Sequence, residues 1–142
     1  MSSTAITPNR VSKPLNASIW IFQLLGAGVF IMAGVMKTMT PIDQLSAMMP
    51  WTGQYPLAFV HFLGLVDFAG GLGLILPSLT RIAPRLTVIA AAACVLLQLI
   101  AICFHSSRGE FNVLPVNAVY ISLALLVLWG RGKKAPITPR NA

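Results

Sequence analysis

The sequence has few charged residues and very few acidic ones. Charged residues make up 9% of its 142 positions, and only three of them are Asp or Glu, whereas soluble domains carry roughly a quarter charged residues. Hydrophobic residues make up 56%, and a chain this short cannot bury that much apolar surface in one core surrounded by water. The mean hydropathy of +0.80 therefore excludes a soluble globular domain, a disordered chain and a nucleic-acid-binding protein. It is typical of an integral membrane protein whose first partner is the lipid bilayer.

Cysteine chemistry and metal-binding motifs are also poorly represented. Cys94 and Cys103 lie nine residues apart in one apolar run, and nine residues of helix span about 13.5 Å. Disulfide-bonded residues have alpha carbons within about 7 Å, so these two cannot pair within a monomer, and we expect both to be buried as small apolar side chains. The histidines lie in different runs, and no metal-binding, phosphate-binding or serine-nucleophile motif is present. We therefore assign no metal site.

Four long apolar runs dominate the chain. They lie at about residues 15–36, 57–76, 86–104 and 111–129. Each has about the 20 residues that a helix needs to cross a hydrocarbon layer of roughly 30 Å, and none alternates as a strand does. Glycine and alanine within the runs favour close helix packing. The sequence predicts an all-α integral membrane four-helix bundle over residues 15–131, between a polar tail at 1–14 and a basic tail at 132–142, both mobile.

The basic residues are concentrated on one side of the predicted spans. Four spans place both tails and the turn between the second and third runs on the same side, which then holds eight of the ten Lys and Arg residues. The positive-inside rule predicts that both termini are cytoplasmic and that Lys37 and Arg108 lie on the outer side of a bacterial inner membrane. The net charge of +7 is thereby explained without a nucleic-acid partner.

The outer connection between the first two runs is the longest. Thr-Pro-Ile-Asp at residues 40–43 is typical of a helix start, with Thr as the N-cap and Pro at the first helical position. Pro50 ends the segment, and the apolar residues between share one face. We predict a short helix at the outer membrane interface. It is either a simple connector or a lid over a pocket.

Asp67 is the most costly polar residue in the spans. It lies near the middle of the second run, where an ionisable group costs several kcal/mol unless it is paired or hydrated. Two hypotheses remain open: an interhelical hydrogen bond that only fixes packing, or a proton-transfer or ligand-binding group. His61 lies six residues earlier, about 9 Å away along the axis and on another face, so a direct pair with Asp67 is not expected.

Most other polar residues of the spans are expected in the outer half of the bilayer. We predict that they form an outward-facing polar pocket with Asp67 as its floor, although each residue alone also fits a packing or interfacial role. The candidate catalytic residues are Asp67, His105 and His61. The candidate ligand-binding residues are Lys37, Gln98, Arg108, Glu110 and Asn117.

Four segments form a pattern beyond hydrophobicity. They are Ala-Gly-Val-Met-Lys at 33–37, Val-Asp-Phe-Ala-Gly-Gly-Leu-Gly-Leu-Ile-Leu-Pro at 66–77, the histidine-containing turn at 105–110, and Gly-Arg at 130–131. With these segments the sequence resembles the DoxX-like family of small bacterial four-span membrane proteins over about residues 19–131. The string acidic-x-x-Gly-Gly-x-Gly-Leu-x-x-Pro is the most specific part of the resemblance.

The resemblance implies a membrane role more clearly than a reaction. Lys37, Asp67 and His105 are the best-matched polar positions, and many relatives have Glu in place of Asp67. Some members of the family are associated with membrane redox systems, including thiosulfate:quinone oxidoreductase and oxidative-stress complexes. The resemblance transfers no family-wide set of catalytic residues.

Three functions remain open from the sequence. The first is an accessory or quinone-interacting component of a membrane redox pathway, with quinone as the candidate cofactor. The second is a cofactor-free acid–base isomerase or cyclase that acts on a lipophilic substrate. The third is a non-catalytic membrane scaffold or assembly factor. A lipophilic small molecule, a membrane or redox partner protein and a homo-oligomer are the partners to be tested.

Overall fold

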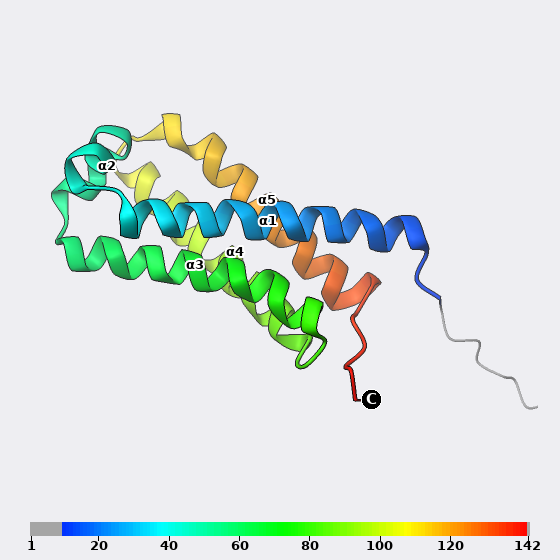
Figure 1. Ribbon diagram of the computed structural model, residues 1–142. Coiled ribbons are helices and arrows are strands. Elements are labelled where there is room, and N and C mark those ends of the chain that lie inside the picture. Colours follow the sequence, from blue (N-terminus) through cyan, green and yellow to red (C-terminus); the bar gives the residue numbers. More distant parts are fainter. Residues whose placement is uncertain (1–9, 142) are drawn as a thin grey trace, which may run out of the picture.

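The computed structural model describes residues 10–141, and that part of the chain is helical without strands (Figure 1). Four helices are long and apolar enough to cross a membrane. Three of them are α1 (Lys13–Met39), α3 (Leu57–Thr80) and α4 (Arg85–Ser107). The fourth, Phe111–Lys134, contains α5 (Leu114–Trp129) and the π-helical turn η3 (Gly130–Lys134). The shorter elements are α2 (Ile42–Met48), η1 (Pro50–Gln54) and η2 (Phe111–Val113). The protein is a four-helix membrane bundle, which confirms the predicted fold class.

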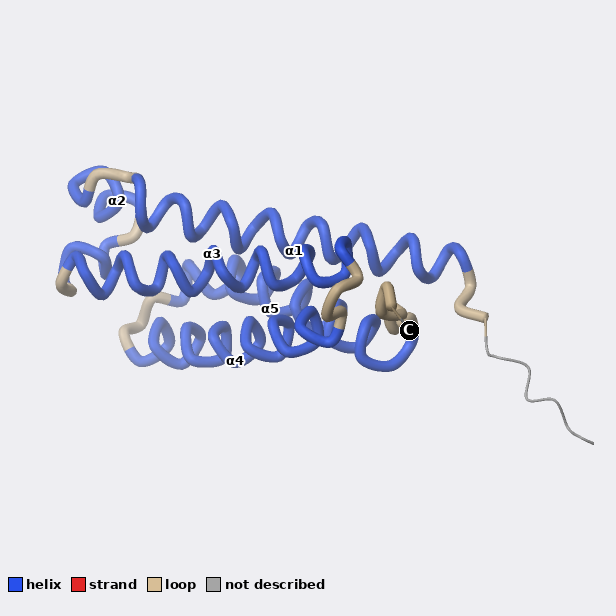
Figure 2. The backbone as a smooth tube through the Cα atoms, turned by 60° about the horizontal axis from the view of Figure 1, so that its bottom comes forward, coloured by secondary structure: helices blue, strands red, loops and turns tan. Residues whose placement is uncertain are grey.

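The four long helices form a ring in which α1 packs on α3 and α5, while α4 packs on α3 and α5. Figures 1 and 2 show α2 and η1 at one end of the bundle and the C-terminus at the other. We call these the α2 end and the terminal end. The start of α1 and the turn between α3 and α4 also lie at the terminal end. Residues 1–9 of the predicted N-terminal tail lie outside the described residues.

The inward faces of α3 and α4 follow a spacing that alternates between three and four residues. On α3 the buried positions are Val60, Gly64, Asp67, Gly71, Leu74 and Ser78. On α4 they are Thr87, Ala91, Cys94 and Gln98. This spacing keeps one seam of a helix facing its neighbours in a left-handed bundle. Large apolar side chains cover the outward faces, where a bilayer would meet them, so polar residues on the seam face the bundle interior.

The contact between α1 and α3 depends on glycine. A Cβ atom placed on Gly34 would lie 2.6 Å from the carbonyl oxygen of Gly64, and one placed on Gly64 would lie 2.8 Å from the Cβ of Lys37. Real side chains do not tolerate such distances, so the two backbones approach each other only because both positions lack a side chain. This glycine crossing sets the level at which Lys37 meets α3.

The short helix α2 matches the interfacial helix predicted from residues 40–43. Its Leu45 is fully buried in an apolar cluster with Trp51 and Val60, to which Phe104 of α4 adds its ring. The rings of Trp51 and Phe104 meet edge to face with centroids 6.1 Å apart. We call residues 42–54 the α2 cap, because they pack over the neighbouring ends of α3 and α4. Its role as a lid stays a prediction.

The described part of the C-terminal tail, which was expected at residues 132–142, packs against the bundle. The backbone N–H of Arg140 donates to the carbonyl of Arg81 over 2.8 Å, and Nε of Arg81 donates to the carbonyl of Thr138 over 2.9 Å. Ala135 is buried. The tail folds back on the turn between α3 and α4 because these hydrogen bonds hold it there, and its mobility stays a prediction.

Candidate functional site

Lys37 and Asp67 form an ion pair inside the bundle. The Nζ atom of Lys37 lies 2.6 Å from Oδ2 of Asp67, and the side chains are only 15% and 7% exposed. Asp67 lies near the middle of the 24-residue helix α3. A buried carboxylate needs a partner, and Lys37 of α1 is the partner of Asp67. Asp67 therefore makes an interhelical hydrogen bond, and whether it also transfers protons or binds a ligand stays a prediction.

The direction of the Lys37 side chain is unusual for a lysine close to a helix end. Lys37 lies two residues before the last residue of α1, Met39, and such lysines commonly extend toward the nearer membrane boundary. Here its Cβ lies at the level of Gly64, and its ammonium reaches Asp67, three residues deeper along α3. The absent side chain of Gly64 leaves the space through which the lysine passes.

The ion pair leaves hydrogen-bonding capacity unused. An ammonium carries three N–H donors, and an ionised carboxylate accepts through both oxygens. Lys37 donates to Oδ2 of Asp67, and within residues 10–141 no other protein group accepts from Lys37 or donates to Oδ1 of Asp67. The pair can therefore donate a hydrogen bond to a further acceptor without breaking its own contact.

A second polar cluster lies at the α2 end. Nδ1 of His105 lies 2.7 Å from Oε2 of Glu110, and Nε of Arg108 donates to Oε1 of the same carboxylate over 2.9 Å. Nη2 of Arg108 also donates to Oε1 of Gln54 over 2.6 Å. These contacts join the turn between α4 and α5 to the α2 cap. Glu110 is the centre of the cluster because its two carboxylate oxygens contact His105 and Arg108.

The hydrogen bond from His105, followed by the bond and charge of Arg108, holds the pKa of Glu110 below its ordinary value of 4.5. A lowered pKa in the folded state means that the ionised carboxylate stabilises this cluster fully above the unfolded-state pKa. That contribution is lost as the pH falls below 4.5 through the lower folded-state value.

The α2 cap is therefore expected to loosen in acid. Backbone amides of residues 42–54 should exchange faster as the pH falls below 4.5, after correction for the intrinsic pH dependence of exchange, and Glu110→Gln should show nearly the same protection at pH 6 and pH 3. Hydrogen-exchange mass spectrometry measures both. An equal acid response in the two proteins would contradict this role of Glu110.

Two further side chains from the predicted pocket bond to each other. Nδ2 of Asn117 donates to Oε1 of Gln98 over 2.9 Å, and Gln98 is buried on the inward face of α4. Near them the hydroxyl of Tyr120 donates to the carbonyl of Val29 over 3.2 Å. These bonds join α4 to α5 and α5 to α1, so Gln98 and Asn117 contribute to helix association in the membrane.

The model of one protein family matches residues 21–127, which include most of the four long helices. The chain belongs to the DoxX-like family. The match covers both Lys37 and Asp67 and the whole His105–Glu110 turn. The comparison with curated proteins and the comparison with solved structures found no match to this chain.

The DoxX-like bundle brings the candidate residues together in three separate groups. Lys37 pairs with Asp67, His105 and Arg108 meet at Glu110, and Gln98 bonds Asn117. His61 joins none of them, since no hydrogen bond to its ring occurs within residues 10–141. Two surface hollows of about 560 and 350 Å³ lie at the terminal end instead. The single outer pocket stays a prediction.

The groups also bear on acid–base and metal chemistry in this DoxX-like protein. Asp67 is bonded to Lys37 and His105 to Glu110, so no direct Asp67–histidine relay is formed. Within residues 10–141, no three His, Cys, Asp or Glu side chains gather as a metal site would require.

Cys94 is buried as expected, but Cys103 is exposed on the outside of the bundle, so the expectation that both cysteines are buried was wrong for Cys103.

Arg131 is a buried polar centre of this DoxX-like bundle, although the sequence indicated only the last residue of the bundle and part of the family resemblance at this position. It is 3% exposed. Its Nε donates to Oε1 of Gln23 over 2.7 Å, and its Nη1 donates to Oδ1 of Asn16 and to the carbonyl of Ala135. It therefore joins the end of α5 to the start of α1. The signal in the sequence was its spacing, seven residues after the buried Ala124.

Proposed function

We propose that this DoxX-like membrane protein is a quinone-interacting component of a membrane redox pathway, and that the quinone head group binds at the Lys37–Asp67 pair. The observation that carries the proposal is the inward direction of Lys37. A lysine whose ammonium was hydrated by bulk water would extend its side chain toward the nearby membrane boundary. This one holds an ammonium with spare donors near the middle of an apolar bundle.

Quinone chemistry suits such a position. A quinone has two carbonyl oxygens that accept hydrogen bonds, and its isoprenoid tail is soluble in the hydrocarbon layer. Binding sites for such molecules are mostly apolar, with a few polar groups that fix the orientation. Asp67 neutralises the lysine charge, so the pair donates to a neutral carbonyl without an isolated ion in the bilayer.

The orientation of the protein belongs to the same proposal. The terminal end carries most of the basic residues, which supports a bacterial inner membrane protein with both termini in the cytoplasm. The Lys37–Asp67 pair then lies between the membrane centre and the outer boundary. A partner redox protein would receive or supply the electrons, because the chain's own polar groups are not electron carriers.

The test is a thermal-shift series on the full-length protein in detergent. Decylubiquinone at about one hundred times its dissociation constant should raise the melting temperature by about 5–10 °C. Decylbenzene, which has the tail without carbonyls, should give no rise. The double variant Lys37→Met/Asp67→Leu replaces the ion pair by apolar side chains of similar size, which keeps the bundle folded.

The double variant distinguishes quinone binding at the Lys37–Asp67 pair from a nonspecific effect of the quinone on the detergent-solubilised protein. It should fold and melt cooperatively, but its melting temperature should not respond to decylubiquinone. No shift in the unmodified protein, or an equal shift in the double variant, would exclude quinone binding at this pair.

A further inference from the structure

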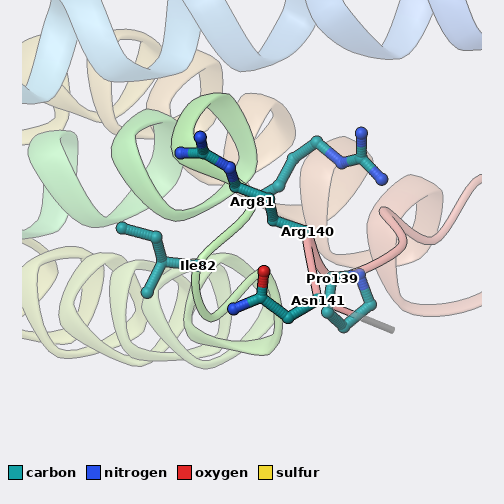
Figure 3. Close-up of a pocket in the computed structure, with 5 residues that line it drawn as sticks. All are labelled: Arg81, Ile82, Pro139, Arg140 and Asn141. Atoms are coloured by element: carbon teal, nitrogen blue, oxygen red, sulfur yellow. The ribbon is translucent and has the colours of Figure 1, made fainter.

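The hollow of about 560 Å³ at the terminal end has a basic lining. Its residues are Arg81, Ile82, Pro139, Arg140 and Asn141 (Figure 3). Two segments distant in the sequence form it, because the end of the chain returns to the turn between α3 and α4. The backbone bond from Arg140 to the carbonyl of Arg81 holds the two backbones next to each other, and Figure 3 shows their guanidinium groups pointing away from each other.

Arg81 is held in a conformation that supports this hollow. It caps α3 with a φ of 59°, in the left-handed region that few residues other than glycine adopt. Its backbone N–H donates to the carbonyl of Pro77, and its Nε donates to Thr138. Within residues 10–141, neither the terminal guanidinium nitrogens of Arg81 nor the side chain of Arg140 has a protein acceptor. Their donors remain available to a ligand.

No Asp or Glu side chain of residues 10–141 lies beside these arginines. The whole sequence has three acidic residues, Asp43, Asp67 and Glu110, and all three lie in the α2 cap, in the middle of the bundle or at the α2 end. Several further lysines and arginines lie at the terminal end. Among the described residues no acidic side chain lies at the hollow, so a ligand can supply its counter-charge.

We propose that this hollow binds the phosphate group of an anionic phospholipid. Arginine forms paired hydrogen bonds with phosphate oxygens, and basic pockets beside the cytoplasmic ends of membrane helices suit lipid head groups. A lipid is favoured over free phosphate because the hollow lies at the end of two membrane-spanning helices and includes Ile82, which is 75% exposed. The exposed side chain of Ile82 can contact an acyl chain while an arginine of the hollow contacts the phosphate.

The test uses the full-length protein and soluble short-chain lipids. Dihexanoyl phosphatidylglycerol should bind saturably, whereas dihexanoyl phosphatidylcholine and inorganic phosphate at the same concentrations should bind at least about fivefold more weakly. Arg140→Gln removes one guanidinium and leaves the backbone bond of residue 140 in place, and it should weaken binding of phosphatidylglycerol about fivefold. Native mass spectrometry or isothermal titration measures the affinities.

Arg10→Gln is the matched control, because Arg10 is exposed at the start of the described chain and its loss changes the net charge equally. It should leave the affinity unchanged within twofold. Arg140→Lys keeps the charge and loses the paired donors, so it should weaken binding without altering the net charge. Equal weakening by Arg10→Gln and Arg140→Gln, or inorganic phosphate that binds as tightly as phosphatidylglycerol, would overturn the proposal.

Discussion

Lys37→Met is expected to lower the free energy of unfolding by about 3–5 kcal/mol, because it leaves the carboxylate of Asp67 buried without a partner. Asp67 is 7% exposed and its bond to Lys37 is 2.6 Å long. The carboxyl group would have to take up a proton or draw in water, and both are costly at that depth. Unfolding of the detergent-solubilised protein in a graded denaturant series measures the loss.

Lys133→Met is the matched control for that variant. Lys133 is exposed at the terminal end, so removal of its charge should change the free energy of unfolding by no more than about 0.5 kcal/mol. A Lys37→Met protein that is as stable as the control would show that the lysine is dispensable. Asp67 would then have to be satisfied in another way.

Gly34→Ala is expected to be the second large effect, a loss of about 3 kcal/mol. The added methyl group would lie 2.6 Å from the carbonyl oxygen of Gly64 and 2.7 Å from the backbone nitrogen of Phe68. Backbone atoms cannot move aside as a flexible side chain can, so α1 and α3 must separate. Separation of these helices also lengthens the contact between Lys37 and Asp67, and the decylubiquinone shift should fall with it.

Gly28→Ala tests the same change on the same helix without the clash. A Cβ atom on Gly28 meets nothing within 4 Å, and alanine is a better helix former than glycine by about 1 kcal/mol. The variant should therefore be as stable as the unmodified protein or slightly more stable. If Gly34→Ala and Gly28→Ala behave alike, then the close approach of α1 and α3 is not required.

The overall architecture followed from the sequence because membrane burial imposes simple rules. Four apolar runs of sufficient length must be helices, and the start signal at residues 40–43 marked α2 within a residue or two. The importance of Asp67 also followed, since an isolated charge in a span needs a partner. None of these inferences required knowledge of which helix faces which.

The pairing of the polar groups could not be predicted in the same way. Lys37 was expected at the outer side as a candidate ligand-binding residue, and its pairing with Asp67 depends on the level at which Gly34 crosses Gly64. That level is a property of two helices together. The three polar groups are separate for the same reason, because each is fixed by its own helix contact.

Arg131 and the C-terminal tail show a different limit. A basic residue that follows the last apolar run is typical of a solvent-exposed tail. Only its position seven residues after the buried Ala124 distinguishes Arg131 from exposed neighbours such as Lys133. The fold-back of the tail rests on two bonds between the Arg81 turn and residues 138 and 140. Backbone bonds between distant segments leave no pattern in a single sequence.

The central claim is that Lys37 and Asp67 act as one buried unit, and a double-mutant cycle measures it most directly. The free energy of unfolding is determined for the unmodified protein, Lys37→Met, Asp67→Leu and the double variant. We expect both single variants to be strongly destabilised and the double variant to recover, with a coupling energy of at least about 2 kcal/mol. Losses that add within about 0.5 kcal/mol would contradict the pairing.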